Sequence, residues 1–171
     1  MKKFLTLFLV IYLSIIFFMP KEELLYTVLN IAQKQKLQLS IKEQKDMGFY
    51  QSLKELSFSH DSSEYLLAYS SKILPLLLFN QISFSNIKPS SSFKSILPFT
   101  ASSIKLTYHV INPFTLSISG DGDFGEIDGE IELDSKRVKI HLIPSKDFEK
   151  SNFIKQFKKT KEGYIYESTI R

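Results

Sequence analysis

The acidic segment 120–134 is the first candidate for chemistry in this chain. It holds seven acidic residues and no basic one, and Asp121, Asp123 and Glu132 fall on the first, third and twelfth places of an EF-hand-like calcium loop. In that motif the glycine stands at the sixth place, whereas Gly125 stands at the fifth, and no helical pattern flanks the loop. Two-residue alternation explains the acids as the wet face of a strand, so we expect no metal site here.

Other residue types with catalytic potential form no constellation. The histidines His60, His109 and His141 lie far apart, each on a predicted polar strand face, where a histidine is usually solvated. Ser117 lacks the G-x-S-x-G frame of a nucleophile elbow. The chain has no cysteine, which excludes a thiol nucleophile, a disulfide scaffold and cysteine-ligated metals. We therefore predict a protein that is not an enzyme and has no cofactor.

The net charge of +4 hides an uneven distribution of charge. Segment 136–161 carries nine basic residues and two acidic ones. It either neutralises the acidic segment across the fold or forms a contact surface for an acidic protein or lipid headgroups. The candidate partner-contact residues are Lys150, Lys155, Lys158, Lys159 and Lys161. So mild a total charge does not suggest direct binding of nucleic acid.

Residues 1–20 predict a membrane anchor. The uncharged run from Phe4 to Met19 has 16 residues, slightly fewer than the roughly 17–25 that span a bilayer, and a flanking lysine can extend it by snorkelling. No small-residue cleavage site follows the run, which favours an uncleaved anchor over a signal peptide. Lys2 and Lys3 predict a cytoplasmic N-terminus, with residues 21–171 on the periplasmic side of a bacterial inner membrane.

A connecting helix is predicted over residues 21–36. Pro20 followed by Glu22 and Glu23 is typical of a helix start. Apolar residues then recur at helical spacing, namely Leu24, Leu25, Val28, Leu29, Ile31 and Ala32.

From residue 37 onward the apolar period changes to two, which predicts a mainly β domain over residues 37–171. The expected architecture is an antiparallel β-meander, as a curved sheet, trough or sandwich, with short flanking helices. The apolar face is expected to include Leu56 and Phe58, Tyr65, Leu67 and Tyr69, Ile82 and Phe84, and Ile104, Leu106 and Tyr108.

Two hairpins have a predicted register. A three-residue loop at Ile111–Pro113 sets Tyr108 opposite Leu116. In the hairpin over 126–143, a two-residue turn at Ser135-Lys136 sets Leu133 opposite Val138 and Ile131 opposite Ile140, with Glu132 facing Lys139 and Glu130 facing His141. This register matches apolar residues with apolar ones and acids with bases.

Three segments depart from the alternation. Ile73–Phe79 contains a proline and is expected to be a buried edge element or an exposed apolar lip, with Leu76, Leu77, Leu78 and Phe79 as candidate lip residues. Segment 88–103 is rich in serine and proline and is expected to be a loop. After Pro144, Ser145 can cap a helix through Lys159, and a last strand is expected over 164–170.

The order of these features resembles the N protein of type II secretion systems in its compact form. The segments that carry the resemblance are Pro20–Leu25, Ile73–Pro75, Ile82–Pro89, Gly122–Leu133, Leu142–Lys146 and Gly163–Glu167. That group is similar in turn to the periplasmic parts of AsmA-like and lipopolysaccharide-transport proteins. The resemblance implies an accessory inner-membrane component of a secretion or DNA-uptake machine, without catalytic residues.

Two functions follow as expectations. The first is assembly with other membrane subunits of a type II secretion-like apparatus, through edge strands and the basic C-terminal segment. The alternative is a periplasmic carrier of lipid or another hydrophobic ligand, in which the meander curves into an open trough and Ile73–Phe79 forms its lip.

Overall fold

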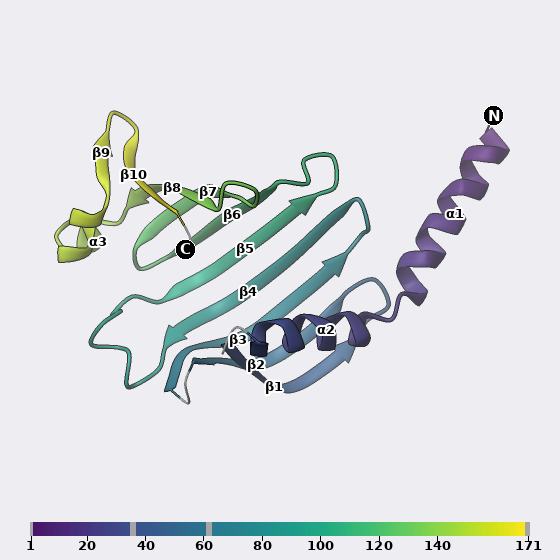
Figure 1. The fold of residues 1–171 in the computed structure, drawn as a ribbon, viewed down its shortest axis with the longest axis horizontal. Helices are drawn as coiled ribbons and strands as arrows, with labels where there is room; N and C mark the ends of the chain where they lie inside the picture. Colours follow the sequence, from purple (N-terminus) through teal and green to yellow (C-terminus); the bar gives the residue numbers. More distant parts are fainter. Residues whose placement is uncertain (1, 35–36, 61–62, 170–171) are drawn as a thin grey trace.

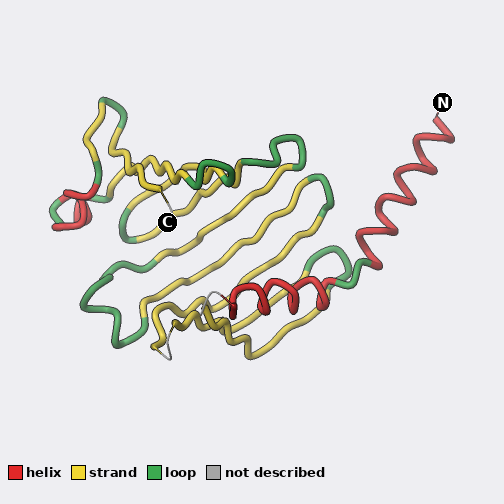
Figure 2. Tube along the Cα trace, in the orientation of Figure 1, coloured by secondary structure: helices red, strands yellow, loops and turns green. Residues whose placement is uncertain are grey.

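A computed structural model describes residues 2–34, 37–60 and 63–169. Two helices, α1 (Lys2–Phe18) and α2 (Lys21–Lys34), precede one ten-stranded sheet in which every pairing is antiparallel. Figures 1 and 2 show α1 projecting away from the sheet and α2 lying over the first strands. The prediction of a mainly β fold is confirmed.

The strands follow one another in space almost as they do in sequence. They are β1 (Leu37–Asp46), β2 (Gln51–His60), β3 (Ser63–Pro75), β4 (Phe79–Pro89), β5 (Ala101–His109), β6 (Thr115–Gly122), β7 (Gly125–Glu132), β8 (Arg137–Pro144), β9 (Lys158–Thr160) and β10 (Gly163–Thr169). The spatial order departs from sequence only at the end, where β10 pairs with β8 and β9 lies outside β10. Between β8 and β9 come the short helix α3 (Lys146–Glu149) and the 3-10 turn η1 (Asn152–Gln156).

The predicted C-terminal helix through Lys159 is wrong. Ser145 does cap a helix, because its hydroxyl accepts a hydrogen bond from the Phe148 backbone N–H at 3.2 Å, but that helix ends at Glu149. Lys158–Thr160 is a strand instead, and Gly163, with φ of 137°, opens β10. Residue 170, the end of the predicted last strand, lies outside the described residues.

One of the two predicted registers is confirmed and the other is wrong. Tyr108 pairs with Leu116, as predicted. In the β7–β8 hairpin, however, Ile131 pairs with Val138 and Glu130 with Lys139, which is two residues away from the predicted register. A shift of two keeps every side chain on its own face, so alternation alone does not distinguish the two registers.

A crease crosses the first four strands and ends on β5, where Ser102 is also left out of the register. One residue of each strand, Lys42, Glu55, Tyr69 and Asn86, falls at an unpaired position inside the register, and Glu55 and Asn86 have φ of 49° and 52°. Strict alternation is therefore interrupted in all four strands at once, so the pairing continues in register beyond the crease.

The crease changes which residues point to the core. Leu53 and Leu56 are both buried although they are three residues apart. On β3 the core residue is Ala68, whereas Tyr69 is 62% exposed and Leu67 is also exposed, so the prediction that Leu67 and Tyr69 belong to the apolar face is wrong. Leu25 and Leu29 of α2 pack on this part of the sheet and cover it.

Helices α1 and α2 meet at a tight elbow. The buried Lys21 ammonium lies 3.3 Å from the Asp46 carboxylate and donates to the carbonyl oxygens of Phe17 and Met19 at 3.2 and 3.3 Å. None of the described helices is by itself long and apolar enough to cross a membrane. The bent pair formed by α1 and residues Lys21–Thr27, at 56° to each other, passes the same test together.

Candidate functional site

The concave face of the sheet forms an apolar groove of about 530 Å³. Fifteen side chains line it, and all of them are apolar. They are Phe58, Leu66, Phe84, Ile87, Leu97, Phe99, Ala101, Ile104, Leu106, Phe124, Ile127, Ile140, Leu142, Phe148 and Phe157. The sheet and the segments at its far end together supply this lining.

Strand register explains how the floor of the groove arises. Phe84 pairs with Ile104, and Ile127 pairs with Leu142, so these apolar residues form a row across four strands. Gly120 occupies the position between them on β6, opposite Ile104. A Cβ atom at Gly120 would lie 2.6 Å from the Ile104 side chain, so glycine permits the close approach here.

Aromatic rings close the groove at the end farther from α1. The Phe99 ring lies 4.7 Å from Phe148 and 5.4 Å from Phe153, and Phe148 lies 6.1 Å from Phe157. Phe99 belongs to the segment between β4 and β5, which the sequence predicted only as a loop over 88–103. Polar and apolar residues do not alternate in this segment. The only sequence signal for its groove residues was therefore the presence of Phe and Leu in a serine-rich loop.

The groove is not filled by the protein's own core. Of its lining residues only Leu142 and Phe148 are buried, and the others are partly exposed. In Figure 1, α2 lies over the first strands and α3 lies beside the last ones, while no helix or strand among the described residues covers β4 and β5. The middle of the sheet therefore presents an apolar surface to whatever occupies the groove.

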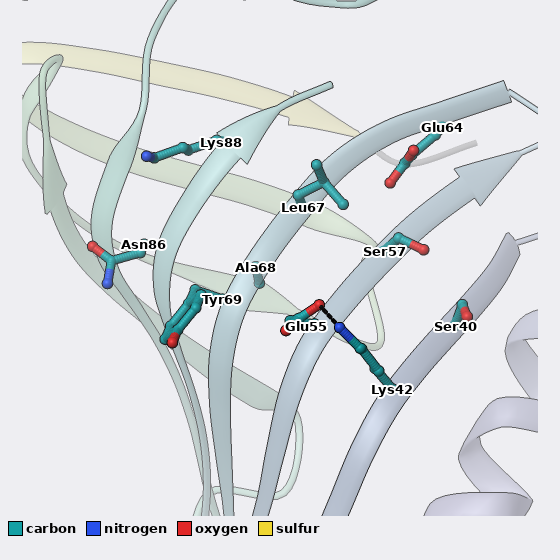
Figure 3. A pocket seen from close by; sticks show the side chains of 10 residues that line it. All are labelled: Ser40, Lys42, Glu55, Ser57, Glu64, Leu67, Ala68, Tyr69, Asn86 and Lys88. Carbon is teal, nitrogen blue, oxygen red and sulfur yellow. Dashed lines mark hydrogen bonds and ion pairs between the residues drawn. The ribbon is translucent and has the colours of Figure 1, made fainter. Parts of the chain in front are cut away.

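A second depression, of about 720 Å³, lies on the opposite face of the sheet along the crease (Figure 3). Two of its four charged residues form an ion pair, in which Lys42 donates to the Glu55 carboxylate at 2.8 Å. This hydrogen bond raises the pKa of the Lys42 ammonium. Tyr69 and Asn86 border it without forming a further polar pair in Figure 3. We regard this depression as a consequence of the crease.

Two acids of segment 120–134 hold neighbouring segments together. Asp121 accepts a hydrogen bond from the Ser103 hydroxyl, and Asp123 accepts one from the Thr100 hydroxyl at 2.6 Å, which ties β6 to the start of β5. Among the described residues, no group of three or more histidine and acidic side chains is arranged to hold a metal ion.

The candidate partner-contact lysines gather at the end of the sheet farther from α1. Lys150 follows α3, Lys155 lies in η1, and Lys158, Lys159 and Lys161 lie in or beside β9. All five are exposed. Lys159 lies 3.9 Å from Glu149 and over the Tyr164 ring at 5.6 Å.

The candidate lip residues lie beside α1. Leu76, Leu77 and Leu78 form the turn between β3 and β4, and Phe79 begins β4, so this segment is neither an edge strand nor buried throughout. The Tyr12 hydroxyl of α1 donates to the Leu76 carbonyl oxygen. Leu77, with φ of 62°, and Leu78 are exposed.

Comparison of the chain with protein-family models, with curated proteins and with solved structures finds no match to any of them.

Proposed function

We propose that this protein is anchored to a membrane by α1 and binds the acyl chain of a lipid in the groove, without acting as an enzyme. The observation that carries the proposal is the uncovered apolar lining of the groove. A sheet face of this kind is unfavourable in water, and an elongated apolar ligand would replace the missing second layer.

The size of the groove is consistent with such a ligand. Its volume of about 530 Å³ falls inside the ~300–1,000 Å³ typical of small-molecule sites. Burial contributes ~0.8 kcal/mol per methylene, so about ten methylenes would gain ~8 kcal/mol before the cost of ordering the chain. No polar side chain lines the groove, so selectivity by hydrogen bonding inside it is not expected.

Anchoring through α1 is supported by the exposure of its apolar residues. Between Lys2 and Phe18 only Tyr12 and Ile16 are withdrawn from the surface, and they share one helix face. The remaining apolar side chains are available to lipid. With Lys2 and Lys3 in the cytoplasm, the β-domain would lie in the periplasm of a bacterial inner membrane.

Native mass spectrometry of the full chain, released from detergent micelles, tests lipid binding. We expect a population that carries one phospholipid and a smaller one for Ala101→Phe, because Ala101 lines the groove. Ser117→Phe is the matched control: it adds the same ring on the exposed outer face of β6 and should leave the lipid-bound fraction unchanged. Equal lipid retention by the two variants would contradict binding in the groove.

A second candidate function is assembly with a type II secretion-like apparatus, as the resemblance implies. The observation that favours it is the edge strand β1, ten residues long, which pairs with β2 on one side and with no other strand among the described residues. The exposed lysines around β9 offer a second contact surface.

Affinity purification from solubilised membranes tests the second function. Secretin or platform subunits should copurify with the full chain and be reduced by Lys155→Glu combined with Lys158→Glu. Recovery of none of these subunits would reject it. The groove variant Ala101→Phe serves as the control, because it leaves both contact surfaces intact.

A further inference from the structure

Exposed apolar side chains gather at the end of the sheet nearest to α1. Four turns meet there: 47–50, 76–78, 110–114 and 133–136. Their exposed large apolar residues include Phe49, Leu77, Leu78, Ile111, Phe114 and Leu133. We refer to these six residues as the apolar rim.

Backbone hydrogen bonds join three of the four turns, and the fourth contacts α1. The Val110 backbone N–H donates to the Leu78 carbonyl oxygen at 3.0 Å. The Leu133 backbone N–H donates to the Phe114 carbonyl oxygen at 2.8 Å. At the other side the Phe49 ring lies 5.5 Å from the Phe17 ring of α1. Turns 76–78, 110–114 and 133–136 are therefore linked in series, and turns 47–50 and 76–78 both contact α1.

The opposite end of the sheet has a different surface. The described turns at that end have one exposed large apolar residue, Ile96. The five partner-contact lysines lie at the same end. Ile111 and Ile96 are 93% and 57% exposed, so they make a matched pair on opposite ends of the sheet. Leu37 and Ile143 are also exposed at that end, but they lie in strands, so the turns there carry fewer exposed apolar residues than the turns beside α1.

The geometry of α1 indicates what covers the rim. Tyr12, which donates to Leu76, precedes the helix end at Phe18 by six residues, or about 9 Å along the axis. Seventeen residues of helix are about 25 Å long, which is shorter than the ~30 Å hydrocarbon core. If such a helix spans the membrane, its C-terminal end is drawn to the level of the interface, and the turn bonded to Tyr12 lies at or below that level.

We propose that the apolar rim inserts into the outer leaflet of the membrane that holds α1, so that the sheet stands on the bilayer by its turn end. This inference rests on the proposed anchoring of α1. The Tyr12 hydroxyl then adds a second hydrogen bond to the Leu76 carbonyl oxygen, which also accepts one from the Leu78 backbone N–H at 2.7 Å. The concave face opens next to the lipid surface, which gives an acyl chain a path into the groove that avoids bulk water.

The absence of cysteine makes a direct test simple. The full chain carrying Ile111→Cys or Ile96→Cys is labelled with an environment-sensitive nitrobenzoxadiazole dye and reconstituted into phosphatidylcholine–phosphatidylglycerol nanodiscs. We expect blue-shifted emission at position 111 that is quenched by doxyl-labelled phospholipid, and neither effect at position 96. A third label at Leu78→Cys should behave as position 111 does.

Three outcomes overturn the inference. Equal quenching at positions 111 and 96 would show that the sheet lies flat on the membrane, and quenching at neither would place the rim in water. A blue shift at 111 without quenching by lipid would mean that protein, such as a second copy of the chain, covers the rim. Ala101→Phe separates this inference from the groove: it should lower lipid retention and leave the quenching at position 111 unchanged.

Discussion

The ion pair at the elbow between α1 and α2 allows a prediction about the relative stability of two single variants and their combination. Lys21 has a side chain that is 1% exposed, whereas that of its partner Asp46 is 39% exposed. Asp46→Asn removes the charge of the partner and keeps an oxygen that accepts a hydrogen bond from the Gly48 backbone N–H, now 2.7 Å from Oδ1. Lys21→Met removes the buried charge itself and retains the length of the side chain.

The expected magnitudes follow from the burial of the two groups. Removing one partner of a fully buried ion pair costs ~3–5 kcal/mol, and because Asp46 is partly exposed we expect about 2 kcal/mol for Asp46→Asn. Lys21→Met should cost about 1 kcal/mol or less, because it also abolishes the desolvation of the ammonium. The Met19 carbonyl oxygen keeps its hydrogen bond from the backbone N–H of residue 21 at 2.8 Å.

The double variant distinguishes this reasoning from simple loss of contacts. With no buried ammonium left to compensate, it should be more stable than Asp46→Asn alone by about 1 kcal/mol. The assay is urea unfolding of the full chain in detergent micelles, followed by far-ultraviolet circular dichroism. If the two single effects add, or if Lys21→Met is the more destabilising single change, the account of Lys21 as a buried charge held by Asp46 is refuted.

Two further predictions concern the sheet. Leu53→Ala should lower the free energy of unfolding by ~2–5 kcal/mol, because Leu53 is buried in the core under α2. Leu78→Ala in the exposed rim should change the free energy of unfolding by less than ~0.5 kcal/mol in the same urea assay. Similar losses for the two variants would contradict the assignment of the core. Gly125→Ala should lower the free energy of unfolding by ~1–3 kcal/mol, because φ at this position is 111° and a Cβ atom would lie 2.1 Å from the Ile143 carbonyl oxygen. If this variant were as stable as the wild type, the β6–β7 turn would have to adjust without cost.

Alternation of polar and apolar residues was sufficient to predict a meander. It did not predict correctly which residues face the core in every strand. The crease is the reason. A bulge-like residue shifts the pattern by one position on each of β1 to β4, and neither Glu55 nor Tyr69 differs in type from an ordinary strand residue. On β5, where the register is irregular only at Ser102, the predicted inward residues Ile104 and Leu106 do line the groove.

The groove itself could be predicted only in part. The sequence suggested an open trough as one of three forms of the meander, but the choice depends on how strongly the strands curve. The lining also depends on contacts between residues distant in sequence, such as the close approach of Gly120 to Ser103 and Ile104. The gathering of apolar residues at one end follows from strand direction, because alternate turns of a meander lie at the same end of the sheet.

The strand order has a consequence for how the chain folds. From β1 to β8 each strand pairs with the strand that precedes it, so each hairpin can close soon after its residues become available, with little loop entropy lost at each step. The C-terminal end is the exception: β9 pairs only with β10, and β10 pairs with β8. β9 therefore has no edge to join until the later strand has docked, so the β9–β10 hairpin is expected to be the last part of the sheet to form.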